Sequence, residues 1–119
     1  MLTEIKHARQ IPNEGYRRWF TDESFDLFVW YMNDKIEGFQ LCYDTRDKAR
    51  AITWRLSSGY SHDKIDDGER VFYNKMTPIL VADGTFEKDI ISEQFKNAAI
   101  RIDNEISSLV YNVLKGYPG

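Results

Sequence analysis

The chain lacks most of the features that assign a chemistry directly. It has a single cysteine, Cys42, among 119 residues, which excludes an internal disulfide and a zinc site built from several cysteines. It has no long apolar run, and its N-terminal segment MLTEIKHARQ predicts neither a signal peptide nor a membrane span. These absences predict a soluble, cytoplasmic protein that has no membrane partner and holds no cofactor.

The sequence also lacks the short motifs of well-known catalytic sites. It contains no phosphate-binding loop, no dinucleotide-binding glycine pattern and no nucleophile elbow. Lys and Arg number 16 against 19 Asp and Glu, a net charge of -3, which argues against nucleic acid because phosphate neutralisation needs clustered cations. No repeat or linker interrupts the chain, so residues 1–119 are predicted to form a single domain.

The first two thirds of the chain carry strand signals. Hydrophobic residues make up 42% of the sequence and aromatic residues 14%, and many of the aromatic residues lie in the first half. Short polar separators divide four strand-like runs, which indicates an antiparallel meander over roughly residues 16–80. We expect strands at 16–20, 25–32, 38–44 and 50–57, a loop at 57–68, a fifth strand at 69–73 and extended chain around Pro78.

Apolar residues recur at three- and four-residue intervals over about residues 85–115, which predicts amphipathic helix. Asp83 or Thr85 would cap its start, and Gly116 with Pro118 would end it. One unbroken helix of about 45 Å would overhang strands of about 23 Å. Either the helix breaks near Lys96–Asn97, or its overhang packs on a second subunit. Four residues of the stripe, which otherwise belong to the core, would then form a homodimer interface: Ile102, Ile106, Leu109 and Val113.

The predicted fold class is therefore α+β, an antiparallel meander sheet of four to five strands with a long C-terminal amphipathic helix, or a helix pair, on one face. A two-residue loop at Asp47–Lys48 would set the register of the third and fourth strands. The apolar pairs would then be Tyr43 with Ile52, Leu41 with Trp54, and Phe39 with Leu56. Cys42 would face Thr53, and Gln40 would face Arg55, on the opposite side of the sheet.

The opposite side mixes aromatic and polar residues. It is predicted to carry Phe28 and Trp19, and Arg18 would fall on the apolar side, which fits an edge strand or a bulge. Aromatic walls with a few polar groups suit a small-molecule site, and arginine beside tryptophan suits a carboxylate, a phosphate or a flat ring. The alternative is a second packing face, in which the Trp and Phe side chains lie under the N-terminal segment and Arg55 pairs with Asp26. The candidate ligand-binding residues are Trp30, Gln40, Cys42, Thr53, Arg55 and Arg17.

Two other groups of residues are considered as functional sites, a cysteine nucleophile and a metal site. Cys42 could be a nucleophile activated by His62 or His7, but no local motif supports this, and buried free cysteines are common. His62 lies among acids in SHDKIDDGE, from Asp63 to Glu69, which suits a divalent cation or simply a solvated acidic turn. We assign no catalytic residue and no metal ligand.

The runs RRWFTDESFDLFVWY, EGFQLCYD and RAITW, followed by SHDKIDDGE and TPILVADG, resemble a family of short, uncharacterised bacterial proteins. The resemblance covers roughly Arg17 to Gly84 and implies a bacterial, single-domain protein without naming an activity. The leading hypothesis is a non-catalytic binding or interaction module that uses the mixed face, possibly as a homodimer. The alternatives are a small enzyme that acts on an anionic small molecule through Arg55 and Arg17, and a divalent-metal-binding protein.

Overall fold

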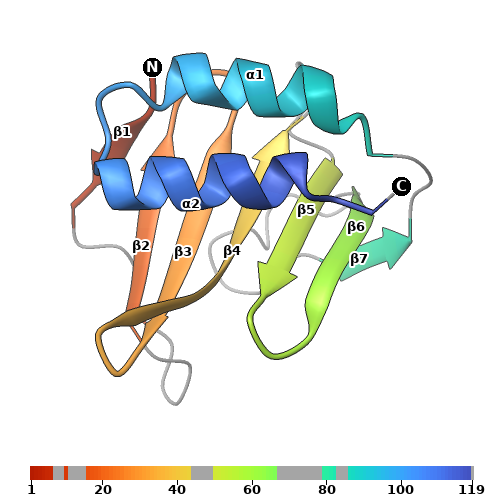
Figure 1. The fold of residues 1–119 in the computed structure, drawn as a ribbon, viewed down its shortest axis with the longest axis horizontal. Coiled ribbons are helices and arrows are strands. Elements are labelled where there is room, and N and C mark those ends of the chain that lie inside the picture. Colours follow the sequence, from red (N-terminus) through yellow and green to blue (C-terminus); the bar gives the residue numbers. More distant parts are fainter. Residues whose placement is uncertain (7–9, 11–15, 44–49, 67–78, 83–85, 119) are drawn as a thin grey trace.

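The protein folds as one antiparallel sheet with two helices packed on one of its faces (Figure 1). The computed structural model describes residues 1–6, 10, 16–43, 50–66, 79–82 and 86–118. Each strand pairs with the next along the chain, so the sheet order follows the sequence. The strands are β1 (Thr3–Ile5), β2 (Tyr16–Thr21), β3 (Asp26–Met32), β4 (Lys35–Tyr43), β5 (Arg50–Arg55), β6 (Gly59–Asp66) and β7 (Ile79–Ala82).

The α+β class and the antiparallel meander are confirmed, but the sheet has seven strands instead of four or five. The prediction of a loop at 57–68 is wrong, because β6 occupies most of that segment. Gly59, with φ of 81°, is the first residue of β6 directly after the turn at 56–58, and β6 pairs with β5 residue by residue from there. The segment is polar in composition, but its residues alternate between the two faces of the sheet, and Tyr60 and His62 point toward the helices. The predicted strand at 69–73 lies outside the described residues.

The predicted register of β4 and β5 is displaced by two residues. Leu41 pairs with Ile52, and Phe39 pairs with Trp54. Tyr43 pairs with Arg50, so the pairing is centred one residue earlier than the assumed Asp47–Lys48 loop, and residues 44–49 themselves lie outside the described residues. Because the side-chain period of a strand is two, a two-residue displacement leaves every side chain on its predicted face. The hairpin of β3 and β4 closes tightly, at Asn33 and Asp34, which both have positive φ as type I′ turns require.

The helical region is a helix pair. α1 (Lys88–Ala98) and α2 (Asn104–Lys115) lie side by side across the strands (Figure 1). α1 ends at Ala98, slightly later than the predicted break. The carboxylate of Asp103 accepts a hydrogen bond from Glu105 N at 2.9 Å and so caps the start of α2. α2 ends at Gly116, as predicted. The predicted N-terminal caps Asp83 and Thr85 lie outside the described residues.

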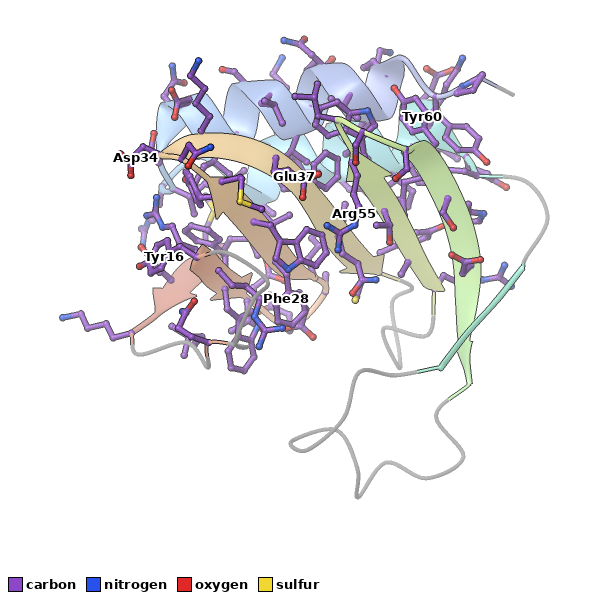
Figure 2. All side chains as sticks on the ribbon, turned by 90° about the horizontal axis from the view of Figure 1, so that it is seen from below. Tyr16, Phe28, Asp34, Glu37, Arg55 and Tyr60 are labelled. Carbon is purple, nitrogen blue, oxygen red and sulfur yellow. The ribbon has the colours of Figure 1, made fainter. Side chains whose placement is uncertain are left out.

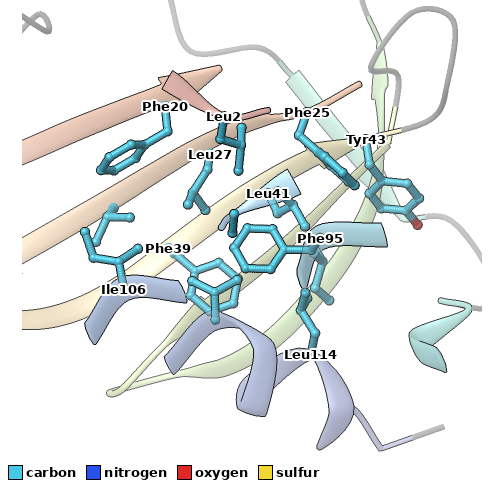
Figure 3. Close-up of a cluster of buried hydrophobic side chains, with 14 of the residues drawn as sticks. Leu2, Phe20, Phe25, Leu27, Phe39, Leu41, Tyr43, Phe95, Ile106 and Leu114 are labelled. Atoms are coloured by element: carbon cyan, nitrogen blue, oxygen red, sulfur yellow. The ribbon is translucent and has the colours of Figure 1, made fainter. Parts of the chain in front are cut away.

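Alternate residues of the strands meet the helices in the main hydrophobic core (Figure 3). Phe25 from the start of β3 contacts Phe95 of α1 edge to face, with ring centres 6.2 Å apart. The hydroxyl of Tyr60 donates to the carbonyl of Val113 at 2.8 Å, which ties β6 to α2. No helix within the described residues is long and apolar enough to span a membrane. The fully covered side chains include Leu2, Phe20, Leu27, Val29, Phe39, Leu41, Ile52, Phe95, Ile106, Val110 and Leu114.

Candidate functional site

The other side of the sheet, which we call the outer face, carries no helix from the described part of the chain (Figures 1 and 2). It corresponds to the mixed face predicted from the sequence. The pairing of β2 to β5 brings its side chains into rows that run across the strands. The outer face comprises Arg17, Trp19, Asp26, Phe28, Trp30, Gly38, Gln40, Cys42, Ala51, Thr53 and Arg55.

Arg55 and Trp30 form the most specific contact of the outer face. Gly38 of β4 pairs with Trp30 on one side and with Arg55 on the other. Because Gly38 has no side chain, Arg55 reaches across it, and its guanidinium carbon lies 4.4 Å from the centre of the Trp30 ring. A Cβ atom at Gly38 would lie 2.4 Å from the carbonyl oxygen of Trp54 and 3.1 Å from Cγ of Arg55. The glycine is therefore a requirement of this contact.

Glu37 holds the other side of the Arg55 guanidinium, with 2.9 Å between Arg55 Nη1 and Glu37 Oε1 (Figure 2). Trp30 pairs with Gly38 while Tyr31 pairs with Ile36, so Glu37 is the extra residue of a β-bulge. The pairing of Arg55 with Asp26 is wrong, since the partner is Glu37. Packing of the face under the N-terminal segment stays a prediction, because residues 7–9 and 11–15 lie outside the described residues. Sequence reasoning missed Glu37, because the strand was predicted to begin at Gly38, whereas β4 begins at Lys35 and carries the glycine and the bulge in its interior.

A second row lies beside the first. The side-chain amide of Gln40 donates to Thr53 Oγ1 at 3.1 Å, and its oxygen lies 3.9 Å from the sulfur of Cys42. Cys42 is 5% exposed and packs with Ala51 and Phe28. Gln40 and Thr53 form a polar strip on the outer face, and both side chains are partly exposed.

Arg17 and Trp19 lie on the outer face, as predicted. The Arg17 guanidinium carbon lies 5.5 Å from the centre of the Phe28 ring, and Trp19 stacks on the same ring with centres 5.8 Å apart. Trp19 Nε1 donates to Asp26 Oδ1 at 3.3 Å. The structure therefore gathers all six predicted ligand-binding residues on one face, in two arginine–aromatic groups joined by the Gln40 strip.

The structure does not assemble the predicted Cys42 nucleophile with His62. Cys42 lies on the outer face, whereas His62 pairs with Ile52 on the helix side of the sheet. The His62 imidazole shares a hydrogen bond with the hydroxyl of Tyr43 and packs against the ring of Phe86. His7 lies outside the described residues.

A metal site around His62 gains no geometric support. His62 is buried on the helix side, whereas Asp63 pairs with Ala51 and belongs to the outer side. Among the described residues, no group of three His, Cys, Asp or Glu side chains is arranged to hold a metal ion. Asp67 and Glu69 lie outside these residues.

The four residues of the predicted dimer interface pack against the protein's own core. Ile106 is completely buried there, and Ile102, Leu109 and Val113 are partly buried against it. The break between α1 and α2 also removes the helix overhang that had suggested a second subunit. Self-association stays a prediction, to be tested in solution.

Sequence reasoning missed a groove on the helix side of the sheet, which we call the Arg18 groove. It has a volume of about 640 Å³ and lies where the β3–β4 turn approaches the start of α2. Arg18 falls on the apolar side of β2, as predicted, just beyond the last residue that β1 pairs. The groove is lined by Glu4, Tyr16, Arg18, Tyr31, Met32, Asn33, Asp34, Asp103 and Glu105.

Arg18 is held by groups from three elements. Its Nε and Nη2 each donate to a carboxylate oxygen of Glu4 at 2.8 Å, and its Nη1 donates to the Tyr31 hydroxyl at 3.2 Å. Asp103, at the start of α2, lies 3.8 Å from Nη1. The hydrogen bonds from Arg18 hold the pKa of Glu4 below its ordinary value, and the same bonds raise the pKa of Arg18.

Comparisons with known proteins do not add a function to this geometry. No protein-family model matches the chain, and neither the curated proteins nor the solved structures give a significant match. The resemblance to short bacterial proteins stays a prediction. The chemistry of the chain must therefore be argued from the arrangement of its own residues.

Proposed function

We propose that the protein is a non-catalytic binding module that recognises a flat, negatively charged group on its outer face. The observation that carries the proposal is the Arg55 guanidinium, which lies 4.4 Å from the Trp30 ring centre and is braced by Glu37. An arginine fixed in this way is prepared for binding, because less side-chain entropy is lost when a ligand arrives.

The expected mode of binding combines a charge contact with polar contacts. Arg55 is partly exposed, and its remaining N–H groups suit the paired oxygens of a carboxylate or a phosphate. Gln40 and Thr53 lie one row away and supply an amide and a hydroxyl to a polar edge of the same ligand. Glu37 would share the guanidinium with the incoming anion, so affinity should be modest and should fall with added salt.

The proposal requires no reacting group, which is consistent with the separation of Cys42 and His62 on opposite sides of the sheet. We also infer a cytoplasmic, bacterial setting and no nucleic-acid partner, in line with the single cysteine and the net charge of -3. Size-exclusion chromatography with light scattering would decide the oligomeric state, and a dimer at micromolar concentration would support the predicted self-association.

The test is a titration followed by two-dimensional NMR of 15N-labelled protein, with benzoate, phenyl phosphate and neutral benzamide as probes. Benzoate and phenyl phosphate should shift the side-chain signals of Trp30 and Gln40, whereas benzamide should leave them in place. Arg55→Gln should abolish these shifts.

The matched control is Arg101→Gln, which removes the same charge from an exposed position between α1 and α2. This variant should bind as the unchanged protein does. Equal shifts with benzamide, or binding that survives Arg55→Gln, would show that the outer face does not recognise anions.

A further inference from the structure

The Arg18 groove holds an uneven balance of charge. Four carboxylates line it, and Arg18 is the one basic side chain among its described lining residues. The whole chain has 16 Lys and Arg against 19 Asp and Glu. Without the five charged groups of the groove, the chain would have 15 of each sign, so the groove accounts for the full negative excess of the molecule. The four carboxylates belong to Glu4, Asp34, Asp103 and Glu105.

Arg18 does not neutralise all four acids, because it is occupied by one of them. Glu4 accepts two hydrogen bonds from it at 2.8 Å, and Asp103 is more distant at 3.8 Å. Asp34 and Glu105 are exposed and have no ion pair with another described residue. Their charges remain directed at a ligand or at solvent.

Aromatic side chains give the groove a second, independent binding feature. Tyr16 and Tyr31 form a tilted pair with ring centres 6.0 Å apart. Tyr16 is 58% exposed and the neighbouring Met32 is 50% exposed, although both are large and apolar enough to pack in a core. Figure 2 shows Tyr16 and Asp34 together at one end of the sheet. A tyrosine face beside carboxylates is an environment that attracts an organic cation and packs its aliphatic stem.

We propose that the Arg18 groove docks an arginine or lysine side chain presented by a segment of a partner protein. The cationic head would lie between Asp34 and Glu105, and its methylene groups would pack on Tyr16 and Met32. A volume of about 640 Å³ accommodates such a side chain together with the backbone that carries it. The inference does not depend on the function proposed for the outer face, because the groove lies on the other side of the sheet.

The experiment is a calorimetric titration at low salt with the peptide acetyl-GRGRG-amide. The double variant Asp34→Asn, Glu105→Gln should weaken binding at least tenfold, and a peptide with citrulline in place of arginine should not bind. Asn at position 34 retains the tolerance for the positive φ of 64° found there, so the turn should be preserved. The matched control is Glu23→Gln with Glu87→Gln, two exposed acids outside the groove, which should bind the peptide as before.

Three outcomes would overturn the proposal. Binding of the citrulline peptide with equal affinity would remove the role of charge. Equal weakening by the control variant would show a general response to net charge instead of a site. Free arginine amide that binds as tightly as the peptide would assign the groove to a small amine and not to a protein segment.

Discussion

The two faces of the sheet come from alternate residues of the same strands, yet their side chains differ in burial and polarity. On the helix side, Phe39 and Leu41 of β4 are completely buried. Between them on the outer face, Gln40 is partly exposed and makes one hydrogen bond to Thr53. The helix side supplies most of the apolar burial that holds the fold together, and the outer face is where we propose that recognition takes place.

The difference between the two faces is tested most strongly by truncating two neighbouring residues of β4, one on each face. Phe39→Ala should lower the free energy of unfolding by about 3–5 kcal/mol, because it opens a cavity in a fully packed core. Gln40→Ala should cost only about 0.5–1.5 kcal/mol, the value of one side-chain hydrogen bond. Urea denaturation of both variants provides the measurement. Similar losses would mean that the outer face is a second core.

Gly38→Ala tests whether the outer face has a fixed architecture of its own. The new Cβ would lie 2.4 Å from a backbone oxygen of Trp54, so the pairing of β4 and β5 must shift, at a cost of about 1–3 kcal/mol. Trp30 fluorescence should change with it, since Arg55 could no longer reach across position 38. The control is Gly59→Asn, at an open position with positive φ that asparagine tolerates, and it should cost less than about 1 kcal/mol. A fully stable Gly38→Ala protein would contradict the close approach.

A smaller effect is expected from the Arg55 and Trp30 contact itself. A double-mutant cycle with Arg55→Gln and Trp30→Leu should give a coupling energy of about 0.5–2 kcal/mol, because the Trp30 ring is buried while the Arg55 side chain above it stays partly exposed. The same cycle between Arg55→Gln and Trp19→Leu should give a coupling near zero, because Trp19 stacks on Phe28 instead. Equal couplings would mean that Arg55 stabilises the face only through general packing.

The smallest expected effect is at Glu4, at the sheet edge. The hydrogen bonds from Arg18 lower the pKa of Glu4 below its ordinary value of 4.5, so its contribution to stability is complete above that value and is lost as the pH falls through the folded-state pKa. Glu4→Gln should therefore cost about 0.2–1 kcal/mol at pH 7, and the cost should shrink as the pH is lowered below 4.5. Urea denaturation at the two pH values measures it. In an Arg18→Gln background the pH dependence should disappear, and its persistence would implicate another group.

The sequence predicted the faces better than it predicted the pairing. Cys42 and Arg55 were placed correctly because side-chain direction follows from local alternation, which survives an error of two residues in register. The register itself depended on where the chain turns between β4 and β5, and Asp47–Lys48, which is not a favoured pair for a two-residue turn, was an unsuitable basis for placing it. The division of the helical region into α1 and α2 could be expected from the sequence, since its apolar stripe was longer than any predicted strand.

Local pattern alone determined the strand and helix periods, the two-sided sheet and the set of residues on its outer face, because these depend on neighbours within a few positions of the chain. Tertiary structure decided the rest. The polar segment that became β6 was stabilised by pairing with β5, and the bulge at Glu37 completed the Arg55 site. The Arg18 groove arose where β1, β3 and α2 converge. Each of these features depends on contacts between distant segments, and such contacts leave little trace in local sequence.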